Sequence, residues 1–322
     1  MIVYDSAYLS IKNKYLIPLT KYRLRYNSLN NCNIKKLLTS GNIKSIDKID
    51  TYEYRIYVDE ELLFKSLLGD IFLMYIRGLI QRKDTECVSQ NRNISANWDI
   101  VTSYYHSYFS ASLLLRLCHR GTIFLDSDER KLIEKIFAQF IGTSISLDSN
   151  IIYEIVNTKD GYILVLKKGD ANTHELVWKE TAKLMMEIKD LTNKKSDELA
   201  MVMSILSVND KLTPTFPSKF RNKVNYQMQY GIKYINNKLY HRNNRLSWIH
   251  EILSFDAKQT LEDDNKMCNI YLAYSKYIEI FTDKMIYDYY DVLGTENGII
   301  KNLNKKYSDA FEIKNYPFDF DV

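Results

Sequence analysis

Apolar and aromatic side chains recur at steps of three and four along much of this 322-residue chain, which is the spacing of one face of an α-helix. The stretch from residue 98 to 117 carries enough aromatic and leucine surface to require packing partners, because most helix stability comes from burying such a face. Its buried face is expected to comprise Trp98, Val101, Tyr105, Tyr108, Ser112 and Leu115. We therefore predict that this helix lies at the centre of the fold.

Other segments with helical spacing cover much of the remaining chain. They are residues 60–82, 127–141, 173–191, 196–206, 218–240, 246–255 and 261–293. Asp126 or Ser127 is suited to cap the start of the second segment, and Gly142 is suited to end it. The chain has only 4 prolines and 10 glycines, so residues that break helices are scarce. This pattern favours a mainly helical protein.

Two segments have the spacing of β-strands instead. Within residues 150–169, β-branched runs flank an Asp160-Gly161 pair, which is typical of a β-hairpin. Residues 52–58 alternate between apolar and polar side chains and predict one further strand, which is a candidate to join the hairpin in a small sheet. Residues 1–50 show little periodicity, and we expect short strands and loops wrapped on the core.

Together these elements predict a mainly α fold, a helical bundle with a small inserted β-hairpin or sheet as its minor α+β part. We divide the chain into an N-terminal α+β portion, residues 1–90, and a helical bundle, residues 91–322, with the hairpin inserted near residues 150–169. Because no internal repeat and no linker rich in Gly, Ser or Pro stands out, the helical core is expected to be a single unit.

The charge of the chain sets few limits on its partners. Its 44 basic and 40 acidic residues give a formal net charge of +4, which permits local contacts with nucleic acid without requiring them. Because it has no run of about 18 uncharged apolar residues and no signal-peptide pattern, we expect no membrane association. The cysteines are isolated in the sequence, as is typical of reduced thiols. We therefore expect a cytoplasmic protein.

The N-terminal region holds the strongest mixture of basic and aromatic residues. This candidate nucleic-acid-binding stretch consists of Lys21, Tyr22, Arg23, Arg25 and Tyr26. Basic side chains of this kind contact phosphates while the rings stack on bases. The alternative is a solvated edge whose tyrosines pack inward.

Many enzyme signatures are absent from the sequence. It has no phosphate-binding glycine loop, no dinucleotide fingerprint, no paired-histidine zinc motif and no serine nucleophile elbow. None of its 5 histidines is spaced as a metal-binding pair. Carboxylate clusters coincide with predicted helix starts, where they act as caps. We therefore expect no metal site and no cofactor.

Two short segments place arginine near a histidine or a tyrosine. Arg221-Asn222 precedes Tyr226, and Arg245 precedes His250 by five residues. An arginine holds a phosphate through two hydrogen bonds, and a histidine transfers a proton. Cleavage of RNA without a metal needs little more, because the 2′-hydroxyl of the substrate is the nucleophile. The alternative for Arg221-Asn222 is a surface arginine paired with a nearby acid.

Here the chain resembles the HEPN family. Tyr104-Tyr105 and the following Tyr108-Phe109-Ser110-Ala111 are similar to the first long helix of HEPN domains. A later helix in that family carries an arginine, a polar residue, several others and then a histidine. Arg221-Asn222 matches the start of that pattern, but Tyr226 stands at the histidine position. Arg245 and His250 have the spacing, but Leu246 replaces the polar residue. The resemblance covers residues 95–255, interrupted by the hairpin.

The resemblance implies a bundle of four or five helices of a kind common in toxin–antitoxin, CRISPR-linked and anti-phage systems. Because Tyr226 departs from the catalytic pattern, the first hypothesis is a non-catalytic or weakly catalytic interaction subunit of a prokaryotic defence complex, with a protein partner or a second copy. The second is a dimeric, metal-independent endoribonuclease that uses Arg221 or Arg245 with His250. The third is a nucleic-acid-binding protein that uses the N-terminal basic stretch, with RNA as a candidate ligand.

Overall fold

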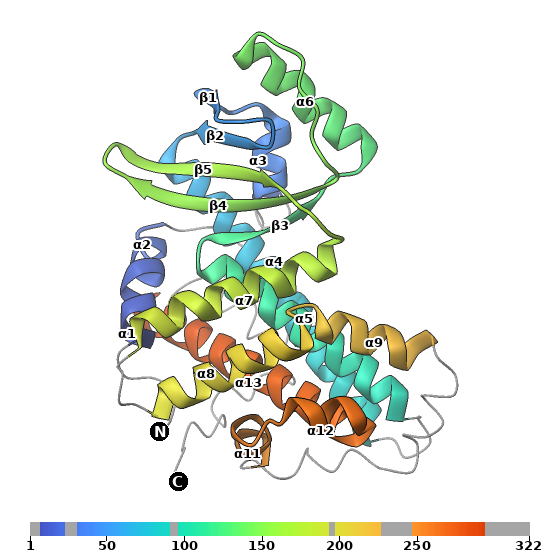
Figure 1. Cartoon of the computed structure of the whole chain (residues 1–322). Helices are drawn as coiled ribbons and strands as arrows, with labels where there is room; N and C mark the ends of the chain where they lie inside the picture. The colour runs from blue at the N-terminus through green and yellow to red at the C-terminus, as the bar shows by residue number, and fades with distance from the viewer. Residues whose placement is uncertain (1–6, 23–30, 91–95, 193–196, 227–246, 294–322) are drawn as a thin grey trace.

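The computed structural model describes residues 7–22, 31–90, 96–192, 197–226 and 247–293. In this part of the chain, a five-stranded sheet lies at one end and a bundle of helices at the other (Figure 1). The long helix α4 (Glu60–Gln90) connects the two, because it packs against strand β5 (Gly161–Lys168) and helix α5 (Ala96–Leu117). The prediction of a mainly α fold with a minor sheet is confirmed.

Helix α5 lies inside the bundle, as predicted. It packs against α4, α7 (Thr173–Leu191), α9 (Phe216–Tyr226) and α13 (Asp264–Leu293). Because partners lie on several sides, burial does not follow one stripe, and Ile100 and Tyr104 are buried as fully as Val101. Trp98, expected on the buried face, has 56% of its surface exposed. That part of the prediction is wrong.

The sheet is antiparallel throughout and has the strand order β1-β2-β5-β4-β3. The strands are β1 (Ser45–Lys48), β2 (Glu53–Tyr57), β3 (Arg120–Phe124), β4 (Asn150–Thr158) and β5. The predicted hairpin is confirmed as β4–β5, with Thr158 opposite Gly161, whose φ of +115° favours glycine. Arg55 of β2 lies opposite Val165 of β5, so strands from both sides of residue 90 form one sheet.

The described part of residues 1–50 is mostly helical and contains one short strand, which corrects the expectation of short strands and loops. It contains α1 (Ala7–Ile11), the π-helical segment η1 (Lys12–Leu16), α2 (Ile17–Leu19) and α3 (Ile34–Ser40), followed by β1. Tyr8, Ile11, Tyr15 and Leu19 are buried at steps of three and four, but the basic residues between them obscured this pattern. The carbonyl of Tyr15 in η1 accepts a hydrogen bond from Nε2 of His119 at 2.9 Å.

The remaining helices differ from the predictions mainly at their ends. They are α6 (Ser127–Ile141), α8 (Asp197–Leu212), α11 (Ser247–Leu253) and α12 (Ala257–Glu262). The helix expected over residues 261–293 is α13, which begins at Asp264 and ends at Leu293, and a separate short helix, α12, precedes it with Asp256 as its cap. The helix expected over residues 218–240 begins at Phe216, and its part beyond residue 226 lies outside the described residues. None of the described helices is long and apolar enough to cross a membrane.

Candidate anion-binding site

A buried arginine lies where α9 packs on α5 and α7. Phe216, Phe220 and Val224 anchor α9 at steps of four residues, and Arg221 follows Phe220 into the contact with α5. Only 8% of the Arg221 surface is exposed. Its guanidinium carbon lies 4.8 Å from the centre of the Tyr104 ring and 5.5 Å from that of Tyr105. Two tyrosine rings of α5 therefore stabilise this cation by cation–π contacts.

No acidic side chain of the described residues neutralises Arg221. In the described part of the chain it forms no ion pair with a carboxylate, and its buried Nε has no hydrogen-bond partner. A buried guanidinium is costly unless a counter-charge or hydrogen-bond acceptors satisfy it. Among the described residues, the surroundings of Arg221 thus supply ring faces and the Tyr104 hydroxyl but no anion.

His174 of α7 lies beside this arginine. Asn172 caps the start of α7 by accepting a hydrogen bond from the backbone N–H of Glu175, which places His174 in the first turn. Nδ1 of His174 lies 3.0 Å from Oη of Tyr104, and its ring centre lies 4.3 Å from that of Tyr108. The imidazole is half-buried among rings of α5.

The electrostatics of the cluster follow from burial and from Arg221. Burial first, and then the positive charge of Arg221, lower the pKa of His174 below its ordinary value of 6.5. Burial raises the pKa of Tyr104, so its phenol stays protonated. At neutral pH the cluster therefore carries one net positive charge, on Arg221. Tyr105 and Tyr108, both half-buried, complete an aromatic surface beside it.

The described residues of the two sequence motifs do not come together in one site. Asn222 is exposed, and Tyr226 has 72% of its surface exposed, whereas Arg221 on the same helix is buried. His250 is exposed on α11, which packs against α13 and α8. Arg245 lies outside the described residues. The histidine that approaches Arg221 is His174, from a different helix.

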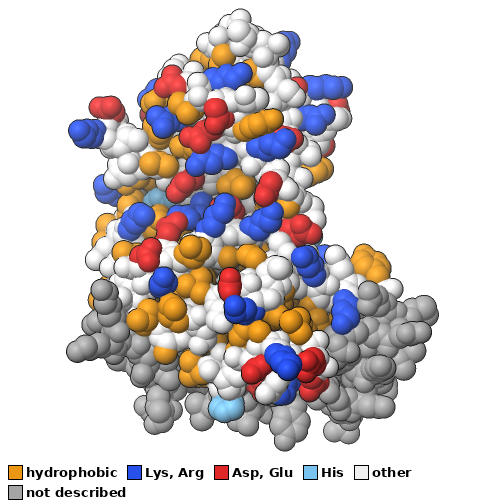
Figure 2. All heavy atoms as spheres, in the orientation of Figure 1, with side chains coloured by type: hydrophobic (Ala, Val, Ile, Leu, Met, Phe, Trp, Pro, Cys, Tyr) orange, Lys and Arg blue, Asp and Glu red, His pale blue; other side chains and the backbone are white. Residues whose placement is uncertain are grey.

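The N-terminal basic stretch is described only in part. Lys21 is exposed, and the Tyr22 hydroxyl donates a hydrogen bond to Glu60. The Tyr22 ring stacks on Phe64 with 4.7 Å between ring centres, so it packs inward. Arg23, Arg25 and Tyr26 lie outside the described residues. The face in Figure 2 shows Lys and Arg side chains interspersed with Asp and Glu, without a basic patch.

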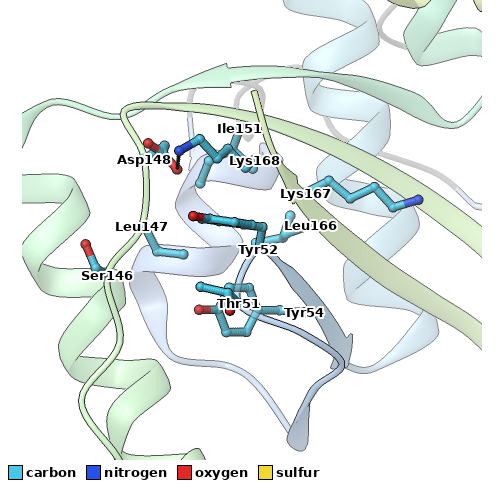
Figure 3. A pocket seen from close by; sticks show the side chains of 10 residues that line it. All are labelled: Thr51, Tyr52, Tyr54, Ser146, Leu147, Asp148, Ile151, Leu166, Lys167 and Lys168. Atoms are coloured by element: carbon cyan, nitrogen blue, oxygen red, sulfur yellow. Dashed lines mark ion pairs between the residues drawn. The ribbon is translucent and has the colours of Figure 1, made fainter. Parts of the chain in front are cut away.

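An open depression of about 250 Å³ lies at the sheet beside Tyr52 (Figure 3). Both lysines that line it are paired, since Lys168 Nζ lies 3.3 Å from Asp148 Oδ2 and Lys167 Nζ lies 3.7 Å from Glu53 Oε2. Lys168 also lies over the Tyr52 ring, 4.7 Å from its centre. These ion pairs already satisfy the charges that would recognise an anion there.

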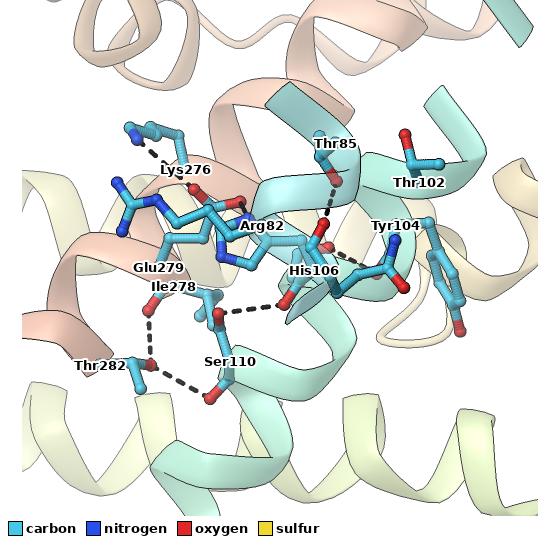
Figure 4. A network of polar contacts seen from close by, with 12 residues as sticks. Arg82, Thr85, Thr102, Tyr104, His106, Ser110, Lys276, Ile278, Glu279 and Thr282 are labelled. Carbon is cyan, nitrogen blue, oxygen red and sulfur yellow. Dashed lines mark hydrogen bonds and ion pairs between the residues drawn. The ribbon is translucent and has the colours of Figure 1, made fainter. Parts of the chain in front are cut away.

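A second polar cluster lies between α4, α5 and α13 (Figure 4). Nδ1 of His106 lies 3.1 Å from Oε1 of Glu279, and Lys276 Nζ lies 3.4 Å from the other carboxylate oxygen. Arg82 NH1 lies 3.4 Å from Oδ2 of Asp283. Each acidic side chain named here faces a basic one. The cluster therefore stabilises the contact between the three helices and leaves none of these acidic charges uncompensated.

Sequence reasoning identified Arg221, Tyr104 and Tyr105 but missed His174 and Trp178. Trp178 lies one helical turn after His174, and its Nε1–H donates to Oη of Tyr104 at 3.3 Å. The spacing of these two residues on α7 was a local signal that one face carries two polar aromatic groups. Their meeting with Arg221 depends on packing of distant segments, which no local pattern reports.

No group of three or more His, Cys, Asp or Glu side chains in the described residues is arranged to hold a metal ion. Comparisons with family models, with curated proteins and with solved structures gave no match to this chain. The site is therefore interpreted from its own geometry and charge.

Proposed function

We propose that this chain is a HEPN-like, non-catalytic interaction subunit that binds RNA through a phosphate at Arg221, as part of a prokaryotic defence complex. The observation that carries the RNA-binding part is the buried guanidinium of Arg221, which no carboxylate of the described residues neutralises. The HEPN-like sequence of α5 supports the defence context by resemblance alone.

A phosphate fits the chemistry of this cluster. It supplies a negative charge, which no described carboxylate provides to Arg221, and arginine pairs with phosphate through a planar, two-pronged hydrogen bond. The half-buried rings of Tyr105, Tyr108 and His174 lie next to it. Bases of a single strand stack on such rings without strong sequence preference. Single-stranded RNA provides a phosphate and a base at neighbouring positions.

Two observations favour binding over cleavage. Tyr226, at the histidine position of the catalytic pattern, is largely exposed while Arg221 is buried, so the two side chains do not converge. The nearby His174 already has its Nδ1 hydrogen-bonded to Tyr104. Binding without turnover is therefore the function that this arrangement supports best.

The binding test compares two charge-removing changes on α9. Arg221→Met keeps a long side chain that stacks on Tyr104 but removes the charge, whereas Lys219→Met removes an exposed charge from the same helix. We expect Arg221→Met to weaken binding of a short oligouridylate by about tenfold, the usual size of one charge-assisted contact. Fluorescence anisotropy with a labelled oligouridylate measures the affinity, and thermal unfolding confirms that both variants fold.

Equal losses in both variants would assign the effect to overall charge and would remove Arg221 from the site. Absence of oligouridylate binding by the wild-type protein would overturn the proposed function. The ribonuclease alternative predicts cleavage of single-stranded RNA in the presence of EDTA that disappears in His250→Ala. We expect intact RNA with both proteins.

A further inference from the structure

The hydroxyl of Tyr104 links His174 to the rest of the site. It accepts a hydrogen bond from Trp178 Nε1 at 3.3 Å and lies 3.0 Å from Nδ1 of His174. A neutral imidazole accepts the single hydroxyl hydrogen of Tyr104 at Nδ1, which leaves the proton of the ring on Nε2. Ser218 and Arg221 of α9 also lie within hydrogen-bonding reach of the Tyr104 hydroxyl, and of these two only Ser218 can accept its hydrogen. The hydroxyl therefore has a second partner toward which it can turn.

The groups that face His174 disfavour its protonation in the free protein. From α5 these groups are neutral tyrosines, Tyr104, Tyr105 and Tyr108, and from α9 the charged group is Arg221. On its own helix, His174 stands in the first turn, where unpaired N–H groups repel a cation. Burial acts in the same direction and lowers its pKa. An anion bound at Arg221 would offset the one positive charge in this set of groups.

We propose that His174 takes up a proton when RNA binds at Arg221, so that the affinity of the site for RNA rises as the pH falls. This inference rests on the proposed function of the same site. A phosphate offsets the charge of Arg221 and favours an imidazolium, which offers a second charged donor. Nδ1–H then donates to Oη of Tyr104, whose own hydrogen turns toward Ser218.

Linkage fixes the sign and the upper limit of the effect. Because the RNA-bound form holds one more proton than the free form, affinity increases with proton concentration, by at most about tenfold per pH unit. The effect is confined to the range in which the free protein leaves His174 neutral and the complex protonates it. Phosphodiester and uracil groups do not titrate in that range, so the oligouridylate itself contributes no proton.

The experiment measures binding of a short oligouridylate between about pH 5 and pH 8, the range in which histidines change charge. Calorimetry in two buffers of different protonation enthalpy counts the protons taken up. We expect wild-type affinity to rise toward acid pH with net proton uptake. We expect the slope to disappear in His174→Gln, which keeps a polar side chain but cannot protonate, and to persist in His250→Gln on exposed α11.

The outcomes separate this inference from the function on which it rests. A wild-type affinity that is flat with pH, or a slope that survives in His174→Gln, would overturn proton coupling and leave RNA binding intact. Absence of binding at every pH would overturn both. If His174→Gln does not fold, the imidazole resonances of His174 in the wild-type protein give the same answer, since their titration must move to higher pH when oligouridylate is added.

Discussion

Replacement of Gly69 by alanine is expected to lower the free energy of unfolding by about 3 kcal/mol, a loss at the upper end of overpacking effects. A Cβ at Gly69 would lie 1.6 Å from the carbonyl oxygen of Cys32, and that oxygen belongs to the backbone. The chain there is held in place, because the next helix, α3, begins with Asn33 as its cap and Ile34 N–H donates to Asp70 at 3.4 Å. Denaturant unfolding followed by circular dichroism measures the loss.

Gly78 provides the matched control on the same helix. A Cβ there would meet only Cβ of Phe109, at an ordinary contact distance of 3.8 Å. Alanine is the better helix former, so Gly78→Ala is expected to leave stability unchanged or raise it by up to about 1 kcal/mol. An equal free energy of unfolding for Gly69→Ala and Gly78→Ala would contradict the close contact between the backbone of Cys32 and α4.

Glu279→Gln is expected to destabilise the protein by about 2 kcal/mol at neutral pH. Glu279 is 13% exposed at its side chain, and its carboxylate faces His106 of α5 and Lys276 of its own helix. The neutral amide leaves these donors without a counter-charge inside the three-helix contact. Glu86→Gln is the control, since that carboxylate also pairs with an arginine of the cluster but is 60% exposed, and we expect a loss below about 0.5 kcal/mol.

The pH dependence of this difference has a definite sign. Burial opposes ionisation of Glu279, but attraction by His106 and Lys276 outweighs it and holds the pKa well below the ordinary value of 4.5. The stability that the carboxylate adds is therefore present above pH 4.5 and is lost as the pH falls below it. Burial raises the pKa of Asp283, which acts in the opposite sense, but both proteins contain it. The gap between wild type and Glu279→Gln should close in acid, as urea titrations at several pH values would show.

Local patterns in the sequence were sufficient for most of the elements but not for their partners. The Asp160-Gly161 turn and the strands around it were predictable, because turn chemistry is local. That the strand near residue 54 joins the hairpin was also expected and is confirmed, but its register was not predictable, since nothing near Arg55 reports its neighbour Val165. Trp98 shows the same limit within a helix, because spacing defines a face but not the position of neighbours.

The candidate site was likewise predictable only where its residues belong to local sequence patterns. Arg221 was recognisable as an arginine in a short motif, and Tyr104-Tyr105 as part of an aromatic helix. His174 was not recognisable as a site residue, because it comes from a helix that follows the inserted hairpin. It meets the arginine only through packing on α5. The motif histidine, His250, is therefore not the histidine of the site, His174. A sequence motif lies in one segment of the chain, whereas the site is formed by side chains from three helices.

The contact between α1 and α13 bears on how the protein is synthesised. The hydroxyl of Tyr8 donates to Asp288 at 2.7 Å, and Lys12 Nζ lies 3.1 Å from the same carboxylate. Since translation proceeds from the N-terminus, α1 leaves the ribosome long before α13 does. The pairing of Tyr8 and Lys12 with Asp288 must therefore wait until some 270 further residues have been added. Emergence of α13, rather than of α1, is therefore the event that allows this contact to form.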